Sequence, residues 1–188
     1  MNQLVVIDNY DSFTYNLVHL LEKVTLQNVD VYRNDEVEVD KLSTYSHIII
    51  SPGPGLPQDA GVSKLAIEKF SPSKKILGVC LGHQAIGEVF GASLINLPTV
   101  FHGVATKMNV LNSNNLFKNI PDSFLVGRYH SWGIKKGLPE SLELLAADEN
   151  GNPMAIKHKH FQCYGVQYHP ESILSEYGEQ LIKNWMNL

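Results

Sequence analysis

A cysteine between two glycines is the feature of this sequence that is best suited to chemistry. Gly78-Val79-Cys80-Leu81-Gly82 follows a short apolar run and precedes a segment with helical spacing. G-x-C-x-G has the spacing of a nucleophile elbow, a tight strand-to-helix turn that projects its nucleophile above the sheet. The residues two before and two after the nucleophile crowd each other there, and glycine removes the Cβ atoms that would clash. The pattern predicts that Cys80 is a nucleophile.

The same turn is expected to activate the thiol. A helix that begins directly after Cys80 brings the positive end of its dipole near the sulfur, which favours the thiolate. The backbone N–H of Leu81 then points to where an oxyanion would form. The alternative is a buried structural cysteine, because free cysteine is among the most buried residue types. Cys163, in the middle of a predicted strand and without the G-x-C-x-G pattern, fits that alternative better.

His169 is the best placed base among the eight histidines. It follows a predicted strand and precedes Pro170, which restrains it to an extended backbone. Residues two apart face the same side of an extended segment, so Glu171 is predicted to hydrogen-bond the His169 ring and fix its tautomer. His83 is the rival base, but a helix would direct it away from the thiol. An exposed turn without a role is the remaining alternative for H-P-E.

A glycine-rich loop, Ser51-Pro52-Gly53-Pro54-Gly55, follows another predicted strand. Two glycines between prolines make a rigid loop whose backbone N–H groups approach a ligand closely and donate to an oxyanion. An ordinary tight turn is the alternative. The loop is not a phosphate-binding P-loop, because the pattern G-x-x-x-x-G-K is absent.

Taken together, G-V-C-L-G-H-Q, S-P-G-P-G and Y-H-P-E resemble the class-I (triad) glutamine amidotransferases, and the resemblance runs the full length of the chain. It implies a Cys80–His169–Glu171 triad and an oxyanion hole formed by the N–H groups of Gly53 and Leu81. It also implies hydrolysis of L-glutamine to glutamate and ammonia, without a metal or an organic cofactor in this chain. The residues that it implies as glutamine contacts are Gly53, Pro54, Gly55, Leu81, Gln84, Ser131 and Trp132.

The segment D-N-Y-D-S-F-T-Y-N, Asp8 to Asn16, narrows the resemblance. It is similar to that of the glutaminase subunits that serve anthranilate synthase, in tryptophan biosynthesis, or aminodeoxychorismate synthase, in folate biosynthesis. This similarity implies that ammonia passes to a chorismate-using large subunit, and any Mg²⁺ would belong to that partner. Aromatic residues among polar ones suit an interface core, so we predict that Asp8–Asn16 docks the partner. Val104 departs from the family pattern, which commonly has lysine after His102-Gly103.

Two other functions remain open at this point. One is a free-standing cysteine hydrolase, which would share an elbow and a histidine. The other is a catalytically silent binding subunit, against which the complete triad argues. Activity toward glutamine, and its dependence on a partner, would distinguish all three.

Short apolar runs that alternate with helical patterns must position these residues. Strands are expected at Leu4–Ile7, Val29–Tyr32, His47–Ile50, Ile76–Val79 and Phe161–Tyr168. Helices are expected from about Thr14, around Leu65–Phe70, after Cys80 with Gly91 as its C-cap, and at Leu181–Met186. This alternation predicts an α/β fold with an open, mostly parallel twisted sheet and helices on both faces, flavodoxin-like in type. The middle of the chain, 93–132, is richer in strand signals, and 111–123 is expected to be an exposed loop.

Length and composition predict one domain over residues 1–188. With 44% hydrophobic residues, the chain can bury a core without disulfides or metals. A net charge of −4 without a Lys/Arg cluster argues against binding to nucleic acid or an anionic membrane. No signal peptide is evident and no apolar run approaches the ~18 residues of a membrane span, so we expect a cytoplasmic protein. Two cysteines without a C-x-x-C pair predict neither a disulfide nor a zinc site.

Overall fold

The computed structural model describes residues 3–112 and 114–188 and is built on a nine-stranded sheet, in the order β2-β1-β3-β4-β11-β10-β9-β6-β7. The strands from β2 to β11 pair in parallel, and those from β11 to β7 pair antiparallel. The parallel strands are β1 (Leu4–Asp8), β2 (Asp30–Arg33), β3 (His47–Ile50), β4 (Lys75–Val79) and β11 (Cys163–Val166). The antiparallel strands are β10 (Pro153–His158), β9 (Leu142–Asp148), β6 (Val104–Val110) and β7 (Ser123–Arg128).

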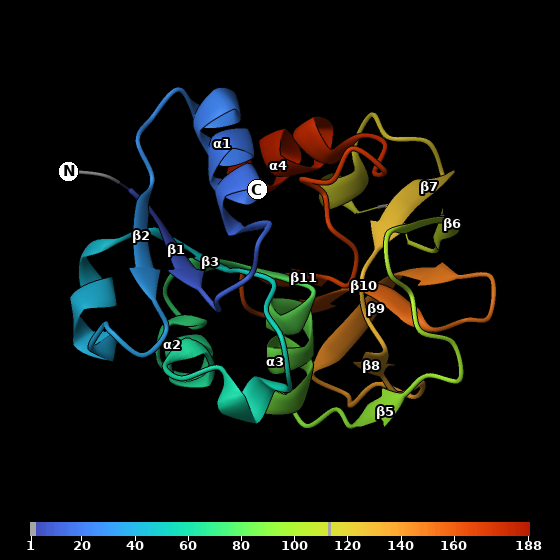
Figure 1. The fold of residues 1–188 in the computed structure, drawn as a ribbon, viewed down its shortest axis with the longest axis horizontal. Helices are drawn as coiled ribbons and strands as arrows, with labels where there is room; N and C mark the ends of the chain where they lie inside the picture. The colour runs from blue at the N-terminus through green and yellow to red at the C-terminus, as the bar shows by residue number, and fades with distance from the viewer. Residues whose placement is uncertain (1–2, 113) are drawn as a thin grey trace.

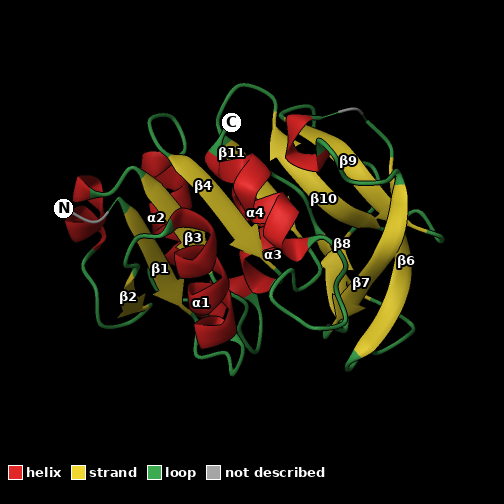
Figure 2. Ribbon diagram, turned by 90° about the horizontal axis from the view of Figure 1, so that it is seen from above, coloured by secondary structure: helices red, strands yellow, loops and turns green. Residues whose placement is uncertain are grey.

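Helices cover both faces of the parallel part, as Figures 1 and 2 show. One face carries α1 (Thr14–Thr25) and α4 (Gly178–Met186), and the other carries α2 (Ser63–Phe70) and α3 (Leu81–Val89). Side chains alternate along a strand, so Leu4 and Val6 join the core under α1 and α4, while Val5 and Ile7 join the core under α2 and α3. A strand that is buried on both faces needs such a continuous apolar run. The parallel strands with helices on both faces confirm the predicted α/β class.

Most predicted elements begin and end within two residues of the expected positions. The last helix begins three residues earlier than expected, at Gly178, and the strand expected at Phe161–Tyr168 is two residues shorter at each end, since β11 spans Cys163–Val166. Beyond it the chain leaves β4 and turns toward β7, since the His169 N–H donates to the Gly127 carbonyl at 3.0 Å. The predicted C-cap of α3 is off by one residue: Phe90 takes the C-cap position, and Gly91 follows it with a φ of 91° and donates to the Glu88 carbonyl at 3.0 Å.

The stretch 111–123 differs from the expected exposed loop. It contains a short 3₁₀ turn, Asn115–Phe117, whose Leu116 and Phe117 side chains are buried in the core on the α4 side. Periodicity could not reveal this anchor, because two apolar residues between polar ones carry no helical or strand pattern. Residue 113 lies outside the described residues.

Three smaller features complete the fold. A two-stranded sheet pairs β5 (Leu94–Asn96) with β8 (Trp132–Ile134), and two further 3₁₀ turns span Val39–Thr44 and Pro57–Asp59. Across the ranges 3–112 and 114–188, none of the helices combines the length and the apolar character needed to cross a membrane.

Candidate active site

Cys80 lies on a strained turn between β4 and α3. Its backbone has φ 52° and ψ −98°, a region that residues with a Cβ atom rarely adopt. A Cβ atom added to Gly78 would lie 2.4 Å from the Gly82 carbonyl carbon and oxygen. One added to Gly82 would lie 2.5 Å from the Ile50 carbonyl oxygen on β3. The two glycines therefore crowd each other as the elbow pattern requires, and Gly82 also packs against the neighbouring strand.

His169 and Glu171 lie side by side after β11. Their side chains are 2% and 0% exposed, and the His169 Nδ1 is 2.7 Å from the Glu171 Oε1. Burial alone would lower the pKa of His169, but the neighbouring Cys80 and Glu171 outweigh it and raise that pKa to about 10. The Nε2 atom has no hydrogen bond to any other described residue. Nδ1 is thus held by the carboxylate, and Nε2 is left for a reacting proton.

Two aromatic rings pack around the imidazole of His169. The Phe13 and Tyr129 ring centroids lie 5.5 Å and 4.8 Å from its centroid, both in edge-on arrangements. Phe13 belongs to Asp8–Asn16, and its ring centroid also lies 4.9 Å from that of Tyr129. The segment after β1 therefore reaches the same rim of the sheet as the predicted base.

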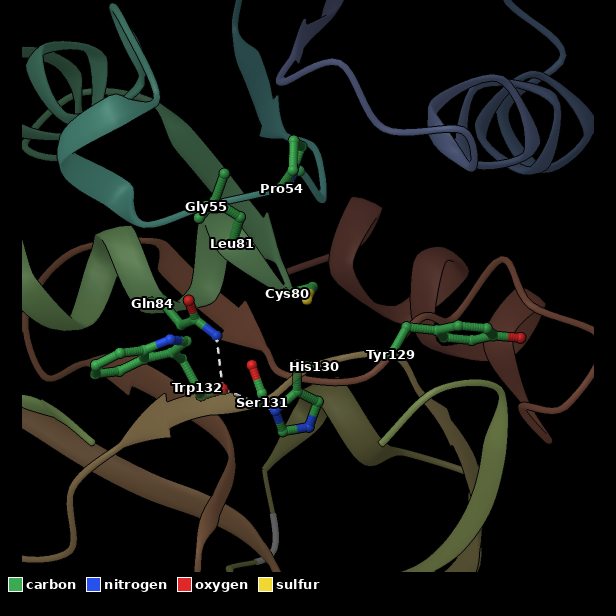
Figure 3. A pocket seen from close by; sticks show the side chains of 10 residues that line it. Pro54, Gly55, Cys80, Leu81, Gln84, Tyr129, His130, Ser131 and Trp132 are labelled. Carbon is green, nitrogen blue, oxygen red and sulfur yellow. Dashed lines mark hydrogen bonds between the residues drawn. The ribbon is translucent and has the colours of Figure 1, made fainter. Parts of the chain in front are cut away.

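A pocket of about 140 Å³ opens next to the cysteine, and Figure 3 shows the side chains around it. All seven predicted glutamine contacts line it together with Cys80, Tyr129 and His130. The loop after β3 comes very close to the elbow, because a Cβ atom on Gly53 would lie 2.8 Å from the Leu81 Cδ2 and 2.5 Å from the Asn9 Cβ. Gln84 lines the pocket and donates through Nε2 to the Trp132 carbonyl at 2.9 Å, a bond drawn as a dashed line in Figure 3.

The two rival residues lie in unreactive surroundings. His83 is fully buried, and its Nδ1 would be 2.9 Å from a Cβ atom placed on Gly165 of β11. Burial lowers the pKa of His83 to about 3, so this imidazole is a neutral packing group between α3 and the sheet. Cys163 is also fully buried, and burial raises the pKa of its thiol. Neither His83 nor Cys163 lines the pocket, so neither replaces Cys80 or His169 as the candidate reactive group.

A buried ion pair that the sequence did not predict supports the pocket wall. Arg128, at the end of β7, donates from Nη1 to the Asp148 Oδ2 at 2.9 Å and from Nε to the His130 Nε2 at 3.0 Å. The His130 Nδ1 lies 2.7 Å from the Trp132 carbonyl oxygen, which can only accept. Burial and the charge of Arg128 lower the pKa of His130 to about 4, so its Nδ1–H tautomer is neutral. Ser131 and Trp132 of this wall were predicted as glutamine contacts, whereas Asp148 comes from β9 and was not predicted.

The arrangement suits acyl transfer through a thiol nucleophile. It combines a thiol, an imidazole oriented by a carboxylate, and backbone N–H groups at a tight loop and a helix start. Within 3–112 and 114–188, no group of three or more His, Cys, Asp and Glu side chains is arranged to hold a metal ion. Attack on the carbonyl carbon of an amide or ester is the chemistry that these groups support together.

Comparison with solved structures places the fold among known proteins. The chain superimposes on a putative GMP synthase component from Thermoplasma acidophilum with a TM-score of 0.87 and 26% identity, covering 100% of this chain and 94% of that one. A glutamine amidotransferase from Thermotoga maritima has the same fold, with a TM-score of 0.74 at 18% identity, over 100% of this chain and 82% of that one.

Sequence comparison gives more similar relatives. Anthranilate synthase component 2 of Pyropia yezoensis is 44% identical over 97% of this chain and 98% of its own length. A putative anthranilate synthase component II of Haemophilus influenzae is 41% identical over 98% of this chain and 95% of its own length. The chain also aligns with the bifunctional protein TrpGD of Thermotoga maritima at 41% identity, and spans 32% of that longer protein. Residues 5–188 match the model of the family described as glutamine amidotransferase class-I, and with this match over nearly its whole length the chain belongs to that family.

Proposed function

We propose that this chain is the glutaminase subunit of an anthranilate synthase, which splits ammonia from L-glutamine and passes it to a chorismate-using large subunit. The observation that carries the proposal is that Cys80 lines one small pocket, while His169, held by Glu171, lies next to the cysteine behind the pocket lining. The full-length similarity to proteins named anthranilate synthase component 2 supports the choice of partner.

The first half-reaction forms a thioester. The Cys80 thiolate attacks the side-chain amide carbon of glutamine, and the oxyanion of the tetrahedral intermediate accepts hydrogen bonds from the N–H groups of Gly53 and Leu81. The high pKa of His169 keeps its imidazolium form beside the thiolate, so a proton is available for the departing nitrogen. Transfer of that proton to the nitrogen breaks the C–N bond and releases ammonia. Gln84 and the 129–132 wall hold the substrate in the pocket.

The second half-reaction regenerates the thiol. His169, now neutral, takes a proton from a water molecule, which attacks the thioester carbon. The second tetrahedral intermediate collapses by breaking its C–S bond and releases glutamate. The leaving Cys80 thiolate is again paired with the imidazolium of His169. Glu171 remains ionised throughout and orients the ring through its 2.7 Å contact with Nδ1.

The segment Asp8–Asn16 and its surroundings carry the partner proposal. Tyr10 and Tyr15 are exposed, whereas Asp8 is buried and accepts from the Tyr10 N–H and the Thr14 hydroxyl. The polar residues thus hold the loop in shape. Tyr15 is exposed, and Tyr10 keeps an exposed part of its ring although its hydroxyl donates to the Asp35 carboxylate at 2.7 Å. Asp11 also accepts from the Phe13 N–H at 2.7 Å, so a structural role for the segment coexists with docking.

Two further apolar residues are exposed next to segments of the proposed active site. Ile173, two residues after Glu171, is 100% exposed, and Val104, which pairs with Arg128 at the start of the pocket wall, is 43% exposed. Isolated apolar residues on a surface are ordinary, but here each lies next to a segment that builds the proposed active site. The large subunit would cover these residues and receive ammonia directly from the pocket. Without lysine at position 104, that contact would be apolar in this chain.

The test is reconstitution with the large subunit co-purified from the native cell. Glutamine plus chorismate should yield anthranilate, whereas aminodeoxychorismate as product would assign the folate pathway instead. Cys80→Ser should abolish glutamine-dependent synthesis and preserve ammonia-dependent synthesis, because the partner carries its own chemistry. Cys163→Ser is the matched control and should retain both. Glutaminase activity in Cys80→Ser would refute the nucleophile, and full activity without any partner would favour a free-standing hydrolase.

A further inference from the structure

Gln167 is buried beside the cysteine, at a position that no sequence motif singled out. Its side chain is 1% exposed, and its Nε2 lies 3.7 Å from the Cys80 Sγ in a geometry that donates to the sulfur. It precedes His169 by two residues on the extended segment that leaves β11. Because alternate residues of such a segment face the same side, Gln167 and His169 both approach the elbow.

The backbone around this amide is held on both sides. The Gln167 N–H donates to the Met154 carbonyl at 2.9 Å, and the His169 N–H donates to the Gly127 carbonyl at 3.0 Å. These two bonds tie the segment to β10 and β7. The Gln167 side chain therefore starts from a fixed position and does not need to be ordered when substrate binds.

The orientation of the Gln167 amide is determined by its neighbour. The Gln84 Nε2 donates to the Trp132 carbonyl oxygen at 2.9 Å and to the Gln167 Oε1 at 3.2 Å. A carbonyl oxygen can only accept, so the Gln84 NH₂ group must face Trp132. Reversing the Gln167 amide would then bring two NH₂ groups together and direct a carbonyl oxygen at the sulfur. The network thus directs a donor, and not an acceptor, toward Cys80.

We propose that the Gln167 side-chain N–H stabilises the Cys80 thiolate and holds the sulfur between His169 and the substrate pocket. A donor to a charged acceptor in a buried site favours the ionised form of that acceptor over its neutral form. An amide carries no titratable proton, so it can act on the sulfur without competing with His169 as the proton carrier. This inference rests on the proposed role of Cys80 as the nucleophile.

Several titratable groups lie on the elements around the Cys80 sulfur, and their charges affect how its reactivity depends on pH. His169 and, behind it, Glu171 come from the segment after β11. His83 comes from α3, while Tyr129 and His130 come from the segment between β7 and β8. Both buried imidazoles have lowered pKa values, to about 3 for His83 and about 4 for His130, and so remain neutral over the range of the test.

The experiment measures the rate of Cys80 alkylation by iodoacetamide as a function of pH, in the full chain with Cys163→Ser as the common background. Gln167→Met keeps the length of the side chain but cannot donate, and Gln167→Asn keeps an amide that is too short to reach the sulfur. Both should move the midpoint of the alkylation profile upward by about one pH unit, which lowers the rate below the midpoint about tenfold. Gln162→Met is the matched control: it makes the same change at an exposed position before β11 and should leave the midpoint unchanged.

Turnover of glutamine by the reconstituted complex adds a second measurement. Both Gln167 variants should lose about tenfold in kcat/KM at neutral pH and recover part of the loss as the pH rises. A merely structural defect would not recover at high pH. Unchanged midpoints in both folded variants would overturn the inference. A shifted alkylation midpoint in a protein without glutaminase activity would instead refute the proposed function and leave the role of Gln167 intact.

Discussion

The two parts of the sheet build the proposed active site in different ways. The parallel part supplies the nucleophile, the base and the glycine loop from the carboxyl ends of adjacent strands, each fixed by apolar packing on both faces. The antiparallel part supplies the pocket wall at 129–132, and this wall is held by a buried Arg128–Asp148 pair that is 2% and 3% exposed. The proposed catalytic residues are thus positioned by hydrophobic packing, whereas the wall of the pocket is positioned by a buried ion pair.

Because the two parts are held by different interactions, substitutions in one should affect catalysis and substitutions in the other should affect the shape of the pocket. A parallel sheet buried on both faces has little freedom of register, because sliding a strand would break both cores. The segment 129–131 leads from β7 of the nine-stranded sheet to β8 of the two-stranded sheet and has no such restraint, so a charged network replaces it. Changes in the first part should therefore act on turnover, and changes in the second on stability and substrate binding.

Removal of the base should give the largest effect. His169→Ala should lower glutamine-dependent turnover by about a hundredfold to ten thousandfold, because proton transfer is lost from both half-reactions. The double variant with Cys80→Ser should lose little more, since members of a catalytic unit are not additive. Glu171→Gln should lose less than His169→Ala. Steady-state glutaminase assays of the complex, with intact-mass detection of the thioester, provide the measurement.

His160→Ala is the control for this series, because His160 is exposed at the other end of β11. It should retain wild-type turnover. Unchanged thioester formation and turnover in His169→Ala would contradict the assignment of the base.

Breaking the buried ion pair should be the most damaging change in the antiparallel part. Arg128→Met leaves the Asp148 carboxylate buried without its cation, which costs about 3–5 kcal/mol in the free energy of unfolding. The exposed pair Lys183–Glu179 is the control, and Lys183→Ala should cost no more than about 1 kcal/mol. Urea denaturation measures both. Equal costs for the two variants would show that the wall does not depend on the buried charges.

Acid should weaken the same ion pair. Burial alone would raise the pKa of Asp148, but hydrogen bonds from Asn152 and the charge of Arg128 outweigh it and hold that pKa below its usual value. The pair therefore contributes stability above the ordinary carboxyl pKa of about 4 and loses it as the pH falls through the lower folded value. The difference in unfolding free energy between wild type and Asp148→Asn should be constant near neutrality and shrink below about pH 4. A difference that does not depend on pH would refute this account.

A methyl group at the elbow should have a smaller effect on stability but a clear one on activity. The Cβ atom of Gly78→Ala would collide with the Gly82 backbone, and such overpacking costs about 1–3 kcal/mol in unfolding free energy. The turn would open, and glutaminase activity should fall with it. Gly133→Ala is the control, because its Cβ atom would lie at an ordinary 3.5 Å from Leu97. Wild-type melting and turnover in Gly78→Ala would contradict the crowding.

Substitutions in the segment Asp8–Asn16 should have the smallest effect on the glutaminase activity of the isolated chain. Tyr10→Ala and Asp11→Ala should change the glutaminase activity of the isolated chain little, while partner-stimulated activity and co-elution fall about tenfold, as for a typical interface anchor. Leu26→Ala removes another exposed apolar side chain, at the far end of α1, and should leave the response unchanged. If Tyr10→Ala and Asp11→Ala bind and respond like wild type, the segment is structural only.

The parallel part could be predicted from the sequence because its signals are local. Apolar runs, the glycines around Cys80 and the alternation through His169 and Glu171 all depend on neighbours within a few residues. Asp148 could not be predicted, because its partner Arg128 lies 20 residues away on a strand that is not adjacent in the sheet. Gln167 lies two residues before His169, so the alternation that placed His169 and Glu171 also placed Gln167 on the same side. Its role could not be predicted, because it depends on contacts with Gln84 and the Cys80 sulfur that only the structure shows.

The place of β11 in the sheet also determines when the molecule becomes active as it is made. β11 pairs with β4, Gly165 opposite Gly78, although more than half of the described strands are synthesised between them. A ribosome that has released the elbow must still produce β5 to β10 before His169 leaves the exit tunnel. We expect an unfinished chain to carry the thiol without its base, which iodoacetamide alkylation of chains truncated before β11 would test. A nascent chain would then not hydrolyse glutamine until β11 and His169 have emerged.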